Sequence, residues 1–110
     1  MLASPEASTE DQQEAQRGAL YAEAQQQYRT GDFRAAAKTY RKILDQNQTD
    51  DDFRRTMLLW LADCCTRTEE ITEARTCYEL ILASPNASAG EKERALGDLA
   101  GLPSVRKWVV

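Results

Sequence analysis

The residues in this sequence with the widest chemical range are three cysteines, Cys64, Cys65 and Cys77. A cysteine thiolate can attack a substrate or bind zinc, and most enzymes activate such a nucleophile with a histidine. The chain contains no histidine, which excludes Ser-His and Cys-His catalytic pairs and His-based metal sites. The cysteines also lack a CxxC spacing, and zinc needs four ligands. We therefore expect no catalytic residue, no metal and no cofactor, and interpret the cysteines as reduced, partly buried thiols, with Cys65 on a packed helix face.

A run of three carboxylates, Asp50, Asp51 and Asp52, is the second feature that could suggest a cation site. A calcium loop combines such carboxylates with a glycine at its turn and a final glutamate, and this run lacks that pattern. Carboxylates also stabilise the positive end of a helix. We expect this run to be a solvated helix start.

Charge and hydropathy restrict the class of partner. The formal net charge is −4 and the isoelectric point is near 4.8, so no general field attracts nucleic acid. No apolar run approaches the roughly 20 residues that a membrane-spanning helix needs, so we expect no membrane partner. Residues 1–8 have neither the basic start nor the apolar stretch of a secretory signal. We therefore expect a cytoplasmic location.

The spacing of the apolar residues predicts helices and no strand, so the expected fold class is all-α. Gly31 is the expected end of the first helix, Asp32 caps the second, and Pro85 stops the fourth. Ser88 and Glu91 form a capping-box pattern that opens the fifth. The predicted helices cover residues 10–29, 32–46, 51–67, 70–83 and 89–100. Together they form one domain, 10–103, between a disordered tail at 1–9 and a C-terminal tail at 104–110.

An internal repeat relates the second and fourth predicted helices. In each copy a large apolar residue precedes an alanine and then a tyrosine: Phe33, Ala36 and Tyr40 in one, Ile71, Ala74 and Tyr78 in the other. These offsets fit one stripe of a helix, and we interpret the stripe as core. The further predicted core residues are Leu20, Ala24, Tyr28, Ala37, Ile43, Leu44, Leu58, Leu61, Ala62, Cys65, Ile81, Leu82, Ala95, Leu96 and Leu99.

The repeat, with Leu20 and Ala24 in the preceding helix, resembles the tetratricopeptide repeat (TPR) family. The resemblance implies about two and a half antiparallel helix pairs, at 17–48, 51–86 and 88–101, stacked as a short right-handed α-solenoid. Three residues depart from the family pattern: Glu69 replaces the turn glycine, Gln48 the terminal proline, and Gln27 a bulky inner residue. Other helical hairpin arrays share these positions, so they stay an alternative.

If the resemblance holds, the first helices of each pair line a concave face that binds a peptide or a partner helix. The predicted function is then a non-catalytic scaffold or adaptor for a protein or peptide partner. Some family members bind the terminal carboxylate of a chaperone peptide with Lys and Asn. Tyr21 and Gln25 occupy the matching first-repeat positions here, so we do not expect a receptor for chaperone tails. The competing interpretation is that Tyr28 only packs against the next helix and the arginines are solvated. The predicted partner-binding residues are Tyr21, Gln25, Tyr28, Arg29, Leu59, Asp63, Arg67 and Arg94.

A second function class remains open, that of a subunit that assembles a larger complex or an oligomer. The segment 31–47 looks somewhat like repeats of the largest protein subunit of the signal recognition particle. The segment 20–31 is a little similar to bacterial secretion chaperones. Two and a half repeats also fall short of the roughly three that bury a continuous core, and residues 105–110 add apolar surface. We therefore also expect stabilisation by a partner or by self-association.

Overall fold

The computed structural model describes the backbone of residues 5–46 and 50–102. It describes the side chains of residue 12, of residues 14–46 and of residues 50–102. In these ranges the regular elements are α-helices, which confirms the all-α class. They are α1 (Pro5–Arg29), α2 (Phe33–Asp45), α3 (Asp51–Arg67), α4 (Ile71–Ala83) and α5 (Ala89–Ala100). The predictions for Gln48 and for the tail at 104–110 lie outside the described residues.

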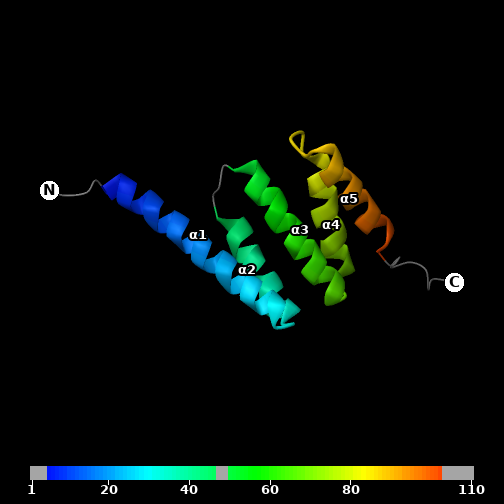
Figure 1. Cartoon of the computed structure of the whole chain (residues 1–110), viewed down its shortest axis with the longest axis horizontal. Helices are drawn as coiled ribbons and strands as arrows, with labels where there is room; N and C mark the ends of the chain where they lie inside the picture. Colours follow the sequence, from blue (N-terminus) through cyan, green and yellow to red (C-terminus); the bar gives the residue numbers. More distant parts are fainter. Residues whose placement is uncertain (1–4, 47–49, 103–110) are drawn as a thin grey trace.

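The helices run back and forth, and each packs chiefly against the next one along the chain (Figure 1). The N-terminal part of α1 projects beyond the other helices, whereas its C-terminal part lies against α2 (Figure 1). The central helix, α3, has α2 and α4 as its main neighbours.

Local capping explains where the helices begin and end. The left-handed backbone of Gly31 (φ 85°) ends the first helix, and the Asp32 carboxylate accepts the backbone N–H of Ala35 at 3.3 Å. The capping box of α5 is also confirmed, with Ser88 and Glu91 bonding each other's backbone N–H at 3.1 and 2.8 Å.

The predicted start of the first helix at residue 10 is wrong, because α1 begins at Pro5. Proline suits the first helical position, where its missing N–H has no intrahelical partner. The expected tail at 1–9 therefore overlaps α1 from residue 5 onward.

Most predicted core residues are buried between the helices, including Ala24, Tyr40 and Leu61. The prediction that Leu96 is buried is wrong, since its exposed fraction is 55%. Helix α5 is the last described helix, so only the face that carries Ala95 is covered by a neighbour. Sequence reasoning also missed Met57, which is fully buried, and underestimated the burial of the cysteines. The full buried apolar set is Ala24, Ala36, Ala37, Tyr40, Ile43, Met57, Leu58, Leu61, Ala62, Cys64, Cys65, Ala74, Cys77, Tyr78, Ile81 and Ala95.

Two unusual residues of the repeat pattern have clear local solutions. The Gln27 side-chain oxygen, placed where a bulky residue was expected, accepts a hydrogen bond from the buried Thr39 hydroxyl at 2.7 Å and so joins α1 to α2. Glu69, in the place of a turn glycine, has a φ of 65°, the only positive φ of a non-glycine residue in the described part of the chain. The hairpin between α3 and α4 therefore keeps the glycine-type turn at a conformational cost.

Candidate functional site

Three predicted partner-binding residues meet where α1 approaches α3. The phenolic hydroxyl of Tyr28 donates a hydrogen bond to Oδ2 of Asp63. Arg67 Nε donates a hydrogen bond to the same Asp63 oxygen at 3.3 Å. The Arg67 guanidinium carbon lies 5.7 Å from the Tyr28 ring centre and 4.9 Å from that of Phe33. The bond to Asp63, together with burial, raises the pKa of Tyr28. We call Tyr28, Asp63 and Arg67 the tyrosine cluster.

Two aromatic rings pack against the Tyr28 ring of this cluster. The Tyr28 ring meets Phe33 and Trp60 edge to face, with centroids 5.2 and 5.0 Å away. Trp60, which sequence reasoning passed over, also stacks on Tyr40 at 6.3 Å. Its position one residue before Leu61, on the flank of the predicted core stripe, was the available signal. Tyr28 is therefore held in place on two sides.

Tyr21 and Gln25, two further predicted contacts on α1, face different neighbours. The Gln25 amide donates to the Tyr40 hydroxyl at 2.5 Å, so it links α1 to α2. The Tyr21 ring meets Phe53 of α3 edge to face at 6.3 Å. Both side chains are half-buried, which leaves part of each surface accessible.

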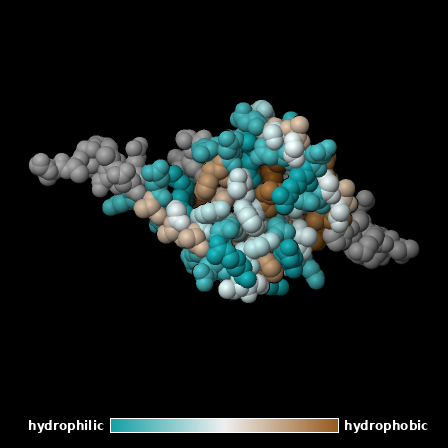
Figure 2. All heavy atoms as spheres, in the orientation of Figure 1, coloured by the Kyte–Doolittle hydropathy of each residue, from teal (hydrophilic) through white to brown (hydrophobic). Residues whose placement is uncertain are grey.

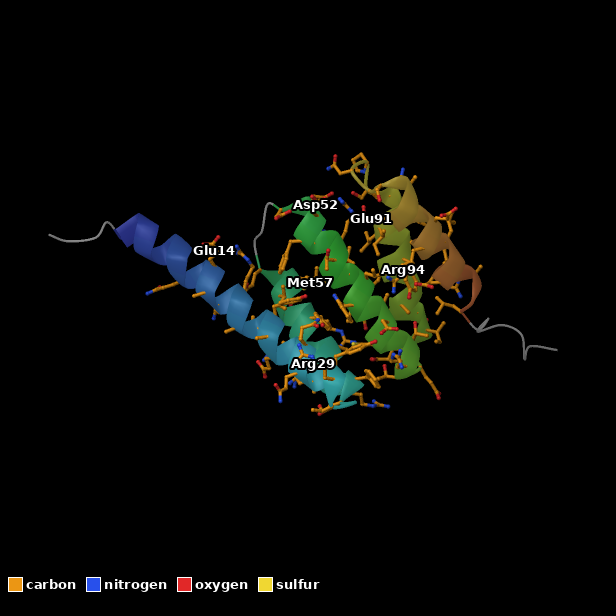
Figure 3. The ribbon with its side chains drawn as sticks, viewed as in Figure 1. Glu14, Arg29, Asp52, Met57, Glu91 and Arg94 are labelled. Atoms are coloured by element: carbon orange, nitrogen blue, oxygen red, sulfur yellow. The ribbon has the colours of Figure 1, made fainter. Side chains whose placement is uncertain are left out.

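Leu59 and Arg94 line one hollow, of about 320 Å³, between α3 and α5. Leu59 and Ile81 provide its apolar surface, and Thr56 adds a hydroxyl. The Arg94 side chain is 66% exposed, and its one ion pair with another described residue is to Asp98 on the same helix, at 3.7 Å. Figure 3 shows Arg94 on α5, in the same region as Glu91. The hollow is lined by Arg55, Thr56, Leu59, Ile81, Ser88, Gly90, Glu91 and Arg94, and we call it the α3–α5 hollow.

Arg29 lies apart from that hollow, at the last position of α1 (Figure 3). Its side chain is exposed, and no ion pair to it is found within the described residues. The predicted set therefore divides into the tyrosine cluster, the α3–α5 hollow, two half-buried side chains on α1 and one exposed arginine. Only the first two groups bring predicted residues together.

The acidic run before α3 organises a buried arginine that sequence reasoning missed. The Asp50 carboxylate caps α3 by accepting the backbone N–H of Phe53 at 3.2 Å, as expected for a helix start. Asp51 and Asp52 bind the guanidinium of Arg55, whose side chain is only 5% exposed. The spacings of three and four residues from these carboxylates to the arginine were the available signal.

Arg55 also connects α3 to α5. Its Nε donates to Glu91 at 3.2 Å, and the Ser84 hydroxyl, before α5, donates to Asp51 at 2.9 Å. The pKa of Asp51 is lowered by the hydrogen bonds from Ser84 and Asn86 and by the charge of Arg55. This network forms the polar wall of the α3–α5 hollow.

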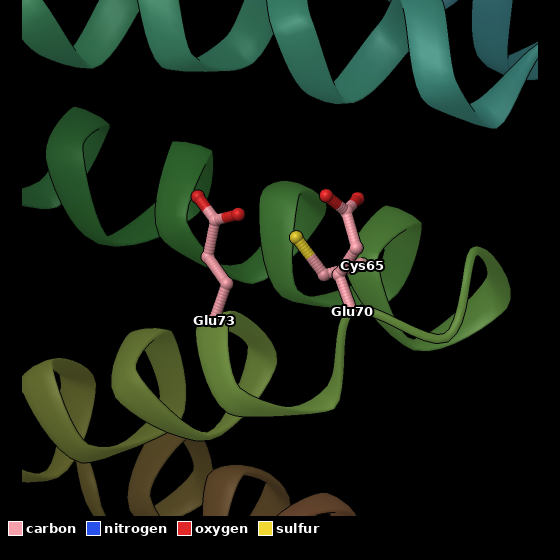
Figure 4. A group of neighbouring side chains, drawn as sticks. All are labelled: Cys65, Glu70 and Glu73. Carbon is pink, nitrogen blue, oxygen red and sulfur yellow. The ribbon is translucent and has the colours of Figure 1, made fainter.

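One group of side chains has the composition of a metal site. Cys65 Sγ and one carboxylate oxygen each of Glu70 and Glu73 lie within 4.8 Å of one another. Figure 4 shows the three side chains directed toward α2. Arg41 of α2 binds Glu73 at 2.6 Å and Glu70 at 3.3 Å through Nη2. Because a cation already joins both carboxylates, we interpret the group as an ion-pair junction between α2 and α4.

The three cysteines are buried, and none of them forms a disulfide. Burial is the main cause that raises the pKa of Cys64, Cys65 and Cys77 to about 12 each. A thiol with such a pKa is protonated at neutral pH and is a poor nucleophile and a poor metal ligand. This environment fits the expectation that the thiols are structural.

The surface viewed in Figure 2 shows small apolar patches separated by hydrophilic residues. Within the described ranges, no helix combines the length and the apolar character that crossing a membrane requires. Comparisons of the chain with known protein families, with curated proteins and with solved structures find no match.

Proposed function

We propose that this protein is a non-catalytic protein-binding module built as a short TPR-like α-solenoid. In this proposal α1–α2 and α3–α4 are two stacked hairpins, and α5 is the first helix of an incomplete third. Packing of each helix against the next supports it, as do the glycine-type turns at Gly31 and Glu69. Helices α1, α3 and α5 then line one concave face.

The α3–α5 hollow is the observation that carries the proposal. It brings Leu59 and Arg94 together, two residues predicted to bind a partner from different repeats. An apolar side chain of the partner would enter against Leu59 and Ile81. The exposed guanidinium of Arg94 would bind carbonyl or carboxylate oxygens beside it. Aromatic and arginine side chains are frequent at binding hot spots, which also favours Tyr21 and Arg29 as flanking contacts.

The tyrosine cluster has a different part in this proposal. Tyr28, Asp63 and Arg67 bind one another, so they position α1 against α3 and shape the face. Partner contacts in this region would use the outer edge of Arg67. The buried, reduced cysteines are compatible with a cytoplasmic protein, which is the location we propose.

Peptide selection tests the proposed function. Peptides enriched from a displayed random library on the wild-type protein serve as probes, and their affinity is measured by calorimetry for wild type and variants. Arg94→Ala and Leu59→Ala should weaken binding about tenfold, or about 1.4 kcal/mol, with wild-type helicity. Lys92→Ala, an exposed change on the same helix outside the hollow, is the matched control. Failure to enrich any peptide, or equal binding by all variants, contradicts the proposal.

A further inference from the structure

A second hollow, of about 360 Å³, opens on the side of α3 opposite to the α3–α5 hollow. Arg54, Leu58 and Leu61 of α3 contribute to it, and their spacing places them on one stripe of the helix. Leu44 of α2 and Leu80 of α4 also line it. We call it the α2–α4 hollow. It contains no residue predicted to bind a partner.

Leu80, with the half-buried Leu44, gives this hollow an accessible apolar surface, whereas Leu58 and Leu61 are buried. Leu80 is 44% exposed and is one of two large apolar side chains classed as exposed in the described part of the chain. The other, Leu96, belongs to α5 and does not line the hollow. An exposed leucine beside a concave surface favours association with another apolar surface.

The charges of the lining indicate what kind of surface would bind in this hollow. Arg41 and Arg54 are positive and Asp45 and Glu73 are negative, so the lining has two charges of each sign in a chain of net charge −4. Arg41 and Glu73 neutralise each other at 2.6 Å. Arg54 and Asp45 are both exposed, and neither has an ion-pair partner among the described residues. Among the described residues, Arg54 and Asp45 therefore leave one unpaired charge of each sign in the lining of the hollow.

We propose that the α2–α4 hollow is the interface of a two-fold symmetric homodimer. In such a dimer both copies contribute the same patch. Residue i of the first copy contacts residue j of the second, and residue j of the first contacts residue i of the second. A two-fold axis between Asp45 and Arg54 pairs each with the opposite charge of the second copy. The balanced charge of this face also avoids the repulsion that two acidic chains experience elsewhere. This proposal is independent of peptide binding to the α3–α5 hollow.

Charge reversal tests the dimer. Sedimentation velocity of the full chain over low to high micromolar concentrations should show a monomer–dimer equilibrium. Asp45→Arg and Arg54→Asp each place like charges opposite one another, and each should raise the dissociation constant about tenfold or more. When these two variants are mixed, the heterodimer has two attractive pairs, so association should return. Reversal of an exposed arginine outside the hollow, Arg34→Asp, should leave the equilibrium unchanged.

Substitutions at the two exposed leucines provide a second test of the dimer. Leu80→Ser should weaken the dimer, whereas Leu96→Ser, at the other exposed leucine, should have no effect. Circular dichroism checks that each variant keeps wild-type helicity. A wild-type monomer at every concentration overturns the proposal. So does a mixture of the two reversal variants that stays monomeric, or an equal effect of the two leucine variants.

Discussion

The Tyr28 hydroxyl of α1 donates a hydrogen bond to the Asp63 carboxylate of α3, across 35 positions of the chain. Helices α1 and α3 are not neighbours in sequence, so this bond joins the two hairpins directly. Arg67 binds the same carboxylate oxygen and covers the Tyr28 ring. The three side chains thereby link α1 to α3.

Removal of the Tyr28 hydroxyl measures this connection. Tyr28→Phe should lower the free energy of unfolding by about 1 kcal/mol, because a hydrogen bond to a charged acceptor is lost while the ring packing remains. Urea unfolding gives the value. A double-mutant cycle with Asp63→Ala should show coupling between the two positions. Additive effects of the two substitutions would show that the bond contributes nothing.

Arg55 is the second residue whose loss should reduce stability. Arg55→Met keeps most of the side-chain volume but leaves Asp51, Asp52 and Glu91 without their shared cation. The melting temperature should fall clearly below that of Arg34→Met, a control at an exposed arginine of α2. Equal melting of the two variants would mean that the network around Arg55 is energetically neutral.

Thiol reactivity separates a structural from a catalytic role of the cysteines. Because burial raises the pKa of all three thiols to about 12, they should react slowly with a disulfide reagent in the native state at neutral pH. The same thiols should react rapidly in urea. One cysteine that reacts in the native protein faster than a free thiol would contradict a purely structural role.

The same pKa shifts predict how stability depends on alkaline pH. The ordinary thiol pKa is 9.0, so above it the unfolded chain loses thiol protons while the native thiols keep theirs up to about pH 12. The native state then binds more protons than the unfolded state, and stability falls as pH rises. The urea midpoint should be lower at about pH 10 than at about pH 8. A midpoint that rises over this interval would contradict the burial of the thiols.

Features that depend on short sequence spacing were predictable. Asp32 and the Ser88–Glu91 capping box predict where α2 and α5 begin. The repeated alanines and tyrosines identify the buried stripes of the helices. Leu96 shows the limit of this reasoning, because its spacing is correct for a core residue but no described helix packs on that side of α5. Whether an apolar face is covered depends on tertiary contacts that periodicity does not contain.

Polar contacts between helices were the least predictable part of the site. Asp63 and Arg67 suggest a pair by their spacing, but nothing in that spacing identifies Tyr28 as the third member. Arg55 was similarly missed, because its third carboxylate, Glu91, lies 36 positions away. The repeat resemblance selected candidate residues on one face, and the structure shows which of them already bind one another.

The most direct test of the proposed binding face is a map of amide chemical-shift changes, recorded as a selected peptide is added to labelled protein. If the α3–α5 hollow is the binding face, the largest changes occur at Thr56, Leu59 and Arg94, and Leu44 and Leu80 change little. Changes concentrated at Leu44 and Leu80, or spread evenly over all five helices, would contradict it.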